Sequence, residues 1–276
     1  AYESVDVWTN QELFCLDGMG RPLVVAGVPP DYFSETGQMW GNPLYNWDRL
    51  ADSNYAWWTS RFRHAFEYFD ILRIDHFRGF ESFWEIPAGA ENAIGGQWKL
   101  GPGRAPFDAA REALGELRIV AEDLGLITDA VHALRDDLGF PGMRVLQFGV
   151  DSEDDPYHRP DSYPVHCFAY TGTHDNDTVL GWYLQRLKEG TDNSILSRYL
   201  GNAGDPVHSM LVRSVLNSAA DSAIIPTQDL LGLDTIARIN TPGLPEGNWV
   251  WRCAKESLSE SLAADLRRWT EAANRI

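Results

Sequence analysis

Cysteine is scarce in this chain. Cys15, Cys167 and Cys253 are the only three among 276 residues, and they are widely separated. An odd, scattered set excludes a disulfide framework. Cys-x-x-Cys and His-x-x-x-His spacings are missing too, so His76, His174 and the acids beside them do not form a recognisable zinc motif. We therefore expect reduced thiols and no bound metal.

Long apolar runs are also missing. Nothing approaches the roughly 20 residues that cross a bilayer. Residues 1–6 have neither the basic region nor the apolar stretch of a signal peptide. We expect a cytoplasmic protein, or a plastid protein if the source is a plant.

Positive charge is the third deficit. The 23 Lys and Arg residues face 40 Asp and Glu residues, which leaves a formal net charge of −17. Such a field repels nucleic acids and anionic membranes and is indifferent to a neutral ligand. We therefore expect no nucleic-acid partner and no membrane partner.

Aromatic residues are plentiful instead. The chain has 11 tryptophans, and for most of them core packing is the expected role. Tyr32, Phe33, Trp40 and Tyr45 differ because they lie in a stretch rich in Gly and Pro, where no regular element is predicted. We predict that residues 27–45 form an aromatic lid loop, long enough to be functional. Exposed rings on such a loop suit stacking on pyranose sugars.

Strand-like and helix-like patterns alternate along the chain, which predicts an α/β fold with a parallel sheet covered by helices. The expected strands are residues 71–74, 117–121, 143–148, 165–170 and 222–226. The expected helices lie within residues 46–69, 106–116, 128–138, 205–215 and 258–269.

Three acidic segments follow these apolar runs, and their key residues are Asp75, Glu122 and Asp175. A barrel enzyme presents acids in this way, one at the C-terminal end of each of several strands. Two carboxylates on either side of one bond suit glycoside chemistry. Taken alone, each segment also fits an ordinary salt bridge or a polar residue at the end of a strand.

The neighbours of these acids favour distinct roles. Arg73 precedes Asp75 by two positions, so both side chains lie on one face of a strand, where a guanidinium keeps a carboxylate ionised. Glu122 directly follows its strand, where burial beside another carboxylate would raise its pKa, as a proton donor requires. Asp123 is expected to face the other way and to pair locally.

Several segments together carry a family resemblance. Residues 71–80, Ile-Leu-Arg-Ile-Asp-His-Phe-Arg-Gly-Phe, with Trp-Glu-Ile-Pro at 84–87, resemble the nucleophile region of the amylomaltases, the 4-α-glucanotransferase family of the α-amylase superfamily. Further segments of the same likeness are residues 28–34, 37–45, 228–232 and 247–249. The likeness runs from about residue 3 to beyond residue 252.

The resemblance implies the C-terminal portion of a (β/α)8 barrel with loop insertions. On this view residues 1–276 are a single catalytic domain, truncated at its N-terminal end. The first two strands and most of the third are expected to be absent, and the missing N-terminal half of the barrel becomes a candidate partner. The glycine-rich residues 95–103 lack the ending of a phosphate loop and are expected to form a loop over the barrel mouth.

The resemblance also implies roles for the acids. Asp75 would be the nucleophile, Glu122 the general acid/base and Asp175 the transition-state stabiliser. Phe148 either lines an acceptor subsite or packs in the core. The implied substrate-binding residues are Arg73, His76, His174, Asp31, Phe33, Trp40 and Phe148. The substrates would be α-1,4-glucans and maltooligosaccharides, and no cofactor is implied.

The implied activity is that of a 4-α-glucanotransferase acting by a retaining double displacement. Two alternatives stay open at this point. One is an α-glucan hydrolase of the α-amylase superfamily, in which water takes the glycosyl group. The other is a catalytically inactive glucan-binding fragment, because residues that complete the donor site would lie in the missing part.

Overall fold

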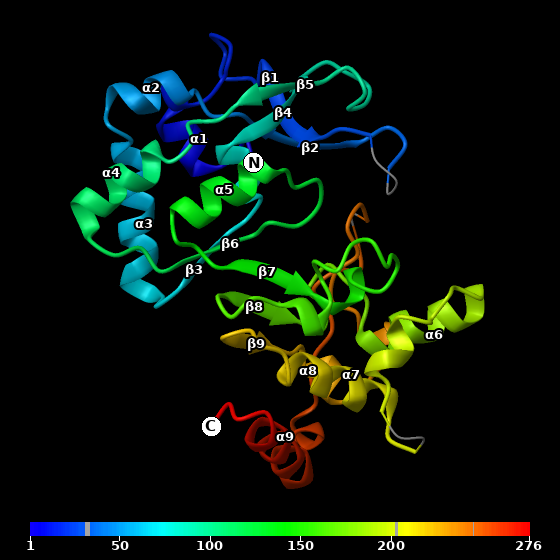
Figure 1. Cartoon of the computed structure of the whole chain (residues 1–276). Coiled ribbons are helices and arrows are strands. Elements are labelled where there is room, and N and C mark those ends of the chain that lie inside the picture. Colours follow the sequence, from blue (N-terminus) through cyan, green and yellow to red (C-terminus); the bar gives the residue numbers. More distant parts are fainter. Residues whose placement is uncertain (31–33, 202–203, 245) are drawn as a thin grey trace. The chain divides into compact units, whose positions relative to one another are not determined.

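The computed structural model of the chain describes residues 1–30, 34–201, 204–244 and 246–276. It divides into two compact units, Ala1–Pro141 (unit 1) and Gly142–Ile276 (unit 2). Their elements are labelled in Figure 1. A single catalytic domain over residues 1–276 stays a prediction.

Unit 1 contains an antiparallel sheet in the strand order β2-β1-β4-β5 (Figure 1). Val25, Ile86 and Ala93 form its small apolar cluster. The strands are β1 (Val24–Val28), β2 (Gln38–Pro43), β4 (Ser82–Pro87) and β5 (Gln97–Leu100). The short helix α1 (Val5–Thr9) precedes this sheet in the chain.

The sheet corrects two expectations. Residues 27–45 are not loop throughout, because β1 extends to Val28 and β2 occupies Gln38–Pro43. Residues 95–103 likewise contain β5. Gly and Pro are compatible with these strands because of where they stand. A Cβ on Gly27 would lie 2.1 Å from the Gln38 carbonyl oxygen, so glycine permits the close strand approach, and Pro43 is the last residue of its strand.

A second, parallel ladder joins β3 (Leu72–Ile74) to β6 (Ile119–Ala121), with Ile74 opposite Ala121. The aromatic side chains of Phe62, Phe77 and Phe107 are fully buried beside it. The helices of this part are α2 (Trp47–Asp52), α3 (Ala56–Tyr68), α4 (Ala105–Leu114) and α5 (Asp129–Asp137). The expected helix at 46–69 is therefore two helices, divided where Asn54 and Tyr55 take positive φ angles.

Unit 2 is built on a parallel sheet in the order β7-β8-β9. Its strands are β7 (Gly142–Val145), β8 (Cys167–Tyr170) and β9 (Ser222–Ile224). Val179, Leu196 and Leu211 are among the fully buried residues that pack around it. The helices that follow the strands are α6 (Val179–Glu189), α7 (Val207–Leu216) and α8 (Thr227–Leu230).

All five strands expected from the apolar runs are confirmed as strands. All five are shorter than expected. In residues 143–148, β7 extends only as far as Val145, and the chain then turns into a 3-10 helix, Leu146–Phe148. Phe148 therefore belongs to that turn and not to the exit of the strand. Within each ladder, β3–β6 and β7–β8–β9, the strands run parallel, as predicted.

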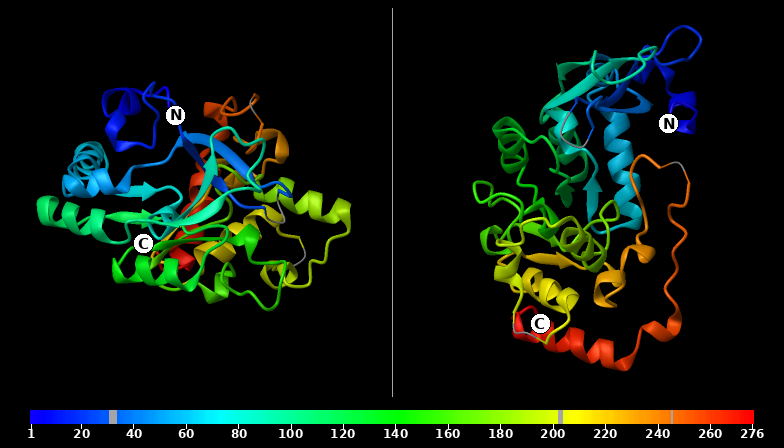
Figure 2. Two further views of the ribbon diagram at one scale, coloured as in Figure 1. Left: turned by 90° about the horizontal axis from the view of Figure 1, so that it is seen from above. Right: turned by 90° about the vertical axis from the view of Figure 1, so that its right-hand side faces the viewer.

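The last helix, α9 (Glu260–Ala272), contains no buried residue. Arg275, just beyond it, donates hydrogen bonds to the carbonyl oxygens of Leu216 (2.5 Å), Ala220 (2.8 Å) and Ser218 (3.1 Å) at the end of α7. Figure 2 shows α9 in red beside the yellow α7. A single guanidinium thus ties the residues after α9 to the end of α7.

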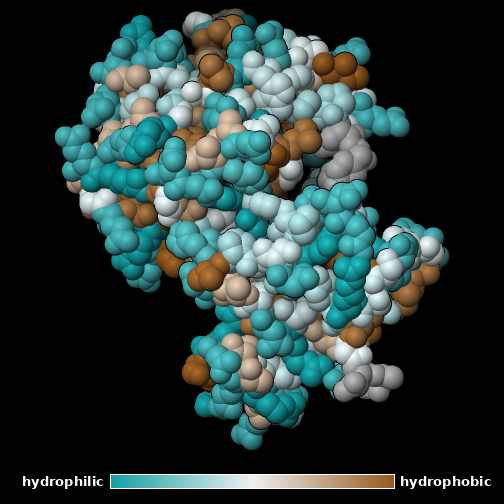
Figure 3. Space-filling model, viewed as in Figure 1, coloured by the Kyte–Doolittle hydropathy of each residue, from teal (hydrophilic) through white to brown (hydrophobic). Residues whose placement is uncertain are grey.

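The face of the molecule drawn in Figure 3 is predominantly hydrophilic. Over the described ranges, no helix combines the length and the apolar character needed to cross a membrane.

We expect Phe107→Ala to lower the free energy of unfolding by about 3–5 kcal/mol, because it leaves a cavity at the centre of the aromatic core of unit 1. Urea unfolding followed by tryptophan fluorescence measures this. Phe69→Ala is the matched control, since Phe69 is 63% exposed. Equal losses in the two variants would contradict the assigned core.

Candidate active site

The turn after β3 presents an exposed carboxylate. The side chain of Asp75 is 81% exposed, and its Oδ1 lies 2.9 Å from Nη2 of Arg73. The ion pair confirms that the two side chains share one face. Asp75 is therefore both oriented and open to a ligand.

Glu122 follows β6 and is almost completely buried, at 9% exposure. The backbone amide of His76 donates to its Oε2 at 2.6 Å, and the amide of Leu124 donates to its Oε1 at 2.9 Å. Burial raises the pKa of Glu122 to about 7, although these two hydrogen bonds oppose the shift. The nearby charge of Asp75 raises the pKa further, and Arg73 lowers it. The carboxyl group is thus poised to hold or release a proton near neutral pH.

His76 links the two acids. Its φ of 49° is left-handed, a conformation in which His is more frequent than most side chains, and it directs the backbone amide toward Glu122. Burial lowers the pKa of the imidazole to about 4, with help from the charge of Arg78 and against the charge of Asp75. The neutral ring lies edge-on to Trp40 of β2, with ring centroids 4.8 Å apart. Such a ring can hydrogen-bond a hydroxyl group without a charge.

Asp123 faces away from these groups, as expected. It is buried and forms an ion pair with Arg135 of α5. Unit 1 therefore separates two adjacent acids, and Glu122 alone joins the cluster of Asp75, His76 and Trp40.

The third acid, Asp175, belongs to unit 2. Its Oδ2 lies 3.3 Å from Nε2 of His174, and its Oδ1 accepts a hydrogen bond from the Asn240 side-chain amide at 2.5 Å. Arg238 donates to the Asp175 carbonyl oxygen at 2.7 Å. The His174 ring packs against Trp249 at an interplanar angle of 35°, with centroids 5.6 Å apart. Asn240 and Arg238 therefore hold Asp175 in place from a segment about 65 residues later in the chain.

The remaining predicted residues have separate surroundings. Phe148 is half-exposed and lies edge-on to His158, with centroids 5.6 Å apart, so it is not a core residue. Asp31 and Phe33 lie outside the described residues. Within the described ranges, no group of three or more His, Cys, Asp or Glu is arranged to hold a metal ion.

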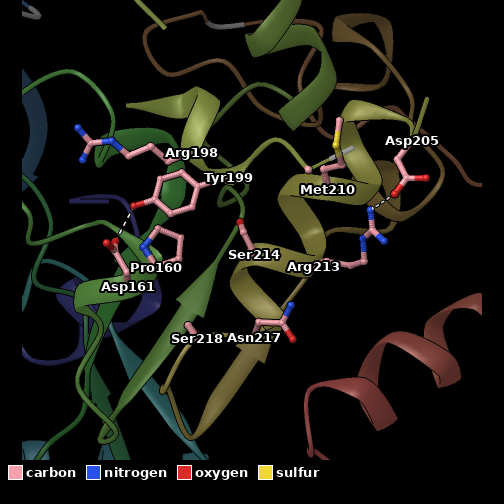
Figure 4. A pocket seen from close by; sticks show the side chains of 11 residues that line it. Pro160, Asp161, Arg198, Tyr199, Asp205, Met210, Arg213, Ser214, Asn217 and Ser218 are labelled. Carbon is pink, nitrogen blue, oxygen red and sulfur yellow. Dashed lines mark hydrogen bonds and ion pairs between the residues drawn. The ribbon is translucent and has the colours of Figure 1, made fainter. Parts of the chain in front are cut away.

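Unit 2 also contains a separate cavity of about 460 Å³, lined by residues of the loop at Pro160 and of α7 (Figure 4). Two pairs of its lining residues interact with each other. Tyr199 donates to Asp161 at 2.5 Å, and Arg213 pairs with Asp205 at 2.5 Å. None of the predicted site residues lines it.

A family model described as 4-alpha-glucanotransferase matches residues 1–258. The chain belongs to the 4-α-glucanotransferase family. It is 48% identical over its whole length to the 4-alpha-glucanotransferase of Thermus thermophilus and 46% identical over 97% of its length to the chloroplastic/amyloplastic enzyme of Arabidopsis thaliana. It covers 56% and 46% of those two proteins, so it spans about half the length of the curated relatives it matches.

Solved structures agree with this family. An amylomaltase from Streptococcus agalactiae in complex with acarbose superimposes with a TM-score of 0.94 at 38% identity, covering all of this chain and 56% of the other. An amylomaltase from Corynebacterium glutamicum matches with a TM-score of 0.77 at 21% identity, covering all of this chain and 45% of the other, which supports the fold alone.

Sequence reasoning missed two site features of this 4-α-glucanotransferase family member. Asp229, noted only within the family-like segment 228–232, is buried and accepts hydrogen bonds from the Thr171 hydroxyl (2.5 Å) and the Val179 amide (2.8 Å). Burial raises its pKa to about 6. Asp229 thus ties the end of β8 to the start of α6, on either side of Asp175. Trp249 was noted in its motif, but its contact with His174 had no signal in the sequence.

The two unlike carboxyl environments generate a prediction. In a pH titration followed by NMR of 13C-labelled carboxyl groups, Glu122 should have its midpoint near pH 7. Asp75→Asn should lower that midpoint, because it removes a neighbouring negative charge. Glu122→Gln identifies the signal, and Asp70→Asn, an exposed change in the same unit, should leave the midpoint in place. A midpoint below 5 in the unmodified protein would contradict the assigned burial.

Proposed function

We propose that the protein carrying this chain is a 4-α-glucanotransferase that moves maltooligosaccharyl segments between α-1,4-glucans. The observation that carries the proposal is the pairing, at neighbouring strand ends, of exposed Asp75 with buried Glu122, whose pKa is raised to about 7. Two carboxyl groups with opposed environments are the requirement for a nucleophile and a proton donor.

In the proposed first half-reaction, the Asp75 carboxylate attacks the anomeric carbon of the donor glucan. The glycosidic C–O bond breaks, and Glu122 gives its proton to the leaving oxygen. The carboxylate left on Glu122 keeps the hydrogen bonds from the amides of His76 and Leu124, which favour the ionised form. In the second half-reaction Glu122 takes a proton from the acceptor's 4-hydroxyl group, which attacks the covalent intermediate and releases Asp75.

Asp175 is proposed to stabilise the transition state. A carboxylate hydrogen-bonded to the 2- and 3-hydroxyl groups of the reacting sugar binds more tightly as the ring gains positive charge. The hydrogen bond from Asn240 and the contact with His174 support this role, because they fix the carboxylate beforehand.

The sugar-binding roles are proposals of the same kind. Arg73 orients the nucleophile, and the neutral imidazole of His76 offers a hydrogen bond beside the Trp40 ring. His174 and the half-exposed Phe148 are proposed to contact further sugar units. Asp31 and Phe33 retain the substrate-binding role that the resemblance implies, and residues 27–45 retain the role of a lid.

The strands that precede the acids are proposed to belong to one (β/α)8 barrel. The parallel pairing of β3 with β6 and of β7, β8 and β9 supports this, because the strands of a barrel end at one mouth, and Asp75, Glu122 and Asp175 follow β3, β6 and β8. The N-terminal strands of such a barrel would come from sequence outside residues 1–276.

The test is incubation with maltotriose and separation of the products by chromatography, for this chain alone and for the full-length protein. Transfer produces a ladder of longer maltooligosaccharides plus glucose. Glucose and maltose without longer products would establish the hydrolase instead. Saturable binding of maltoheptaose without turnover in the full-length protein would establish a binding protein.

Asp75→Asn should lower kcat by more than about 1,000-fold, since the covalent route is lost. The disproportionation of maltotriose measures this. Asp70→Asn is the control for a charge change in the same unit and should keep full activity. Transfer that survives in Asp75→Asn would overturn the assignment of the nucleophile.

A further inference from the structure

Arg78 is a buried charge without a direct ionic partner. Its side chain is 5% exposed, and among the described residues it forms no ion pair. The carboxylate of Glu81 is linked to it through Ser82, whose hydroxyl donates to Glu81 at 2.5 Å and accepts from Arg78 at 3.1 Å. Removing a charge from water costs free energy, so a buried guanidinium here calls for an explanation of what it contributes.

The guanidinium of Arg78 contacts the loop that begins with Glu122. Its Nη1 donates to the carbonyl oxygen of Leu126. Its plane lies over the Trp98 ring of β5, with 4.0 Å between the guanidinium carbon and the ring centroid. Arg78 therefore spans from the antiparallel sheet to the far end of this loop, residues 122–126.

The near end of the loop is attached separately. The Glu122 amide donates to the Ile74 carbonyl at 2.9 Å, and the Phe77 amide donates to the Glu122 carbonyl at 3.1 Å. Asp123 pairs with Arg135. Between these points the chain turns at Gly125, whose φ is +92°. The Leu124 amide donates to the Glu122 carboxylate. Leu124 lies between the near end of the loop, held by Ile74, Phe77 and Arg135, and the far end, held by Arg78. The direction of its N–H therefore depends on both ends.

Arg78 also acts on His76 through its charge. It is one of the groups that hold the imidazole pKa low, together with burial. The groups facing His76 are Arg78 and Asp75 from its own turn, the Glu122 carboxylate from β6 and the Trp40 ring from β2. Arg78 thus contacts the loop that supports Glu122 and also affects the pKa of His76.

We propose that Arg78 is a positioning residue for the reaction: its forked guanidinium fixes the loop 122–126 so that the Leu124 amide stays on the Glu122 carboxylate. This rests on the proposed role of Glu122 as the general acid/base. The contacts of Arg78 within the described residues are with Leu126, Ser82 and Trp98, and not with the carboxylates of Asp75 or Glu122.

Arg111 provides a matched control within the same unit. Its Nη2 donates to the carbonyl oxygen of Leu138, and its guanidinium lies over the Phe140 ring at 5.2 Å. Like Arg78, it donates to a backbone carbonyl and covers an aromatic ring, but these contacts are to Leu138 and Phe140 and not to the loop 122–126. A merely structural role predicts similar behaviour for the two arginines.

The experiment compares Arg78→Lys, Arg78→Met, Arg111→Lys and Arg111→Met in the full-length protein. Lysine keeps the charge and loses the fork, whereas methionine loses both. Arg78→Lys should lower kcat for maltotriose about 10–100-fold with KM within about twofold, because a displaced proton donor slows the chemical step. The Arg111 variants should keep kcat within about twofold at a similar loss of Tm.

Two readouts do not depend on activity. Backbone hydrogen exchange in residues 122–126 should rise about tenfold or more in both Arg78 variants and in neither Arg111 variant. The NMR titration midpoint of His76 should rise in Arg78→Met and stay low in Arg78→Lys, because only methionine removes the charge.

Unchanged exchange in residues 122–126, or equal kcat values for Arg78→Lys and Arg111→Lys, would overturn the proposal. If the full-length protein shows no glucan transfer, the proposed function fails. The hydrogen exchange of residues 122–126 and the His76 titration then still test, without any activity, whether Arg78 holds this loop. If Arg78→Met does not fold, Arg78→Lys still carries the exchange and kcat comparisons.

Discussion

The parallel ladder between β3 and β6 is the constraint on which the site in unit 1 depends. It pairs Ile74 with Ala121, so the next residues, Asp75 and Glu122, leave the sheet side by side. A shift of one residue would turn one carboxylate to the opposite face. The hydrogen bonds around Glu122 then depend on this register, since its carboxylate reaches the His76 amide only from that position.

Burial, and not charge alone, separates the two acids. Asp75 keeps contact with solvent and with Arg73, whereas Glu122 loses solvent and gains two amide donors. The same contrast recurs in unit 2, where Asp175 is exposed and held by Asn240 while Asp229 is buried beneath the turn. In each unit, one acid is open to a ligand and another is enclosed by the backbone.

The strands of the two parallel ladders were predictable because each lies in a short, mostly apolar run of the sequence. The antiparallel sheet was not, because Gly27 and Pro43 suggest loop until the close approach of Gln38 is known. Asp75, Glu122 and Asp175 could be named from sequence, with the resemblance. Their partners could not, because the Leu124 amide and the Asn240 side chain come from positions whose direction only the folded backbone determines.

Two structural requirements meet at His76, one on its backbone and one on its ring. Its backbone must take a left-handed conformation to aim an amide at Glu122, and its ring meets Trp40. Asparagine or glycine adopts that conformation readily, so either would preserve the amide while replacing the ring. The position is therefore a place where an engineer can replace the ring that meets Trp40 and leave the amide that supports the Glu122 carboxylate intact.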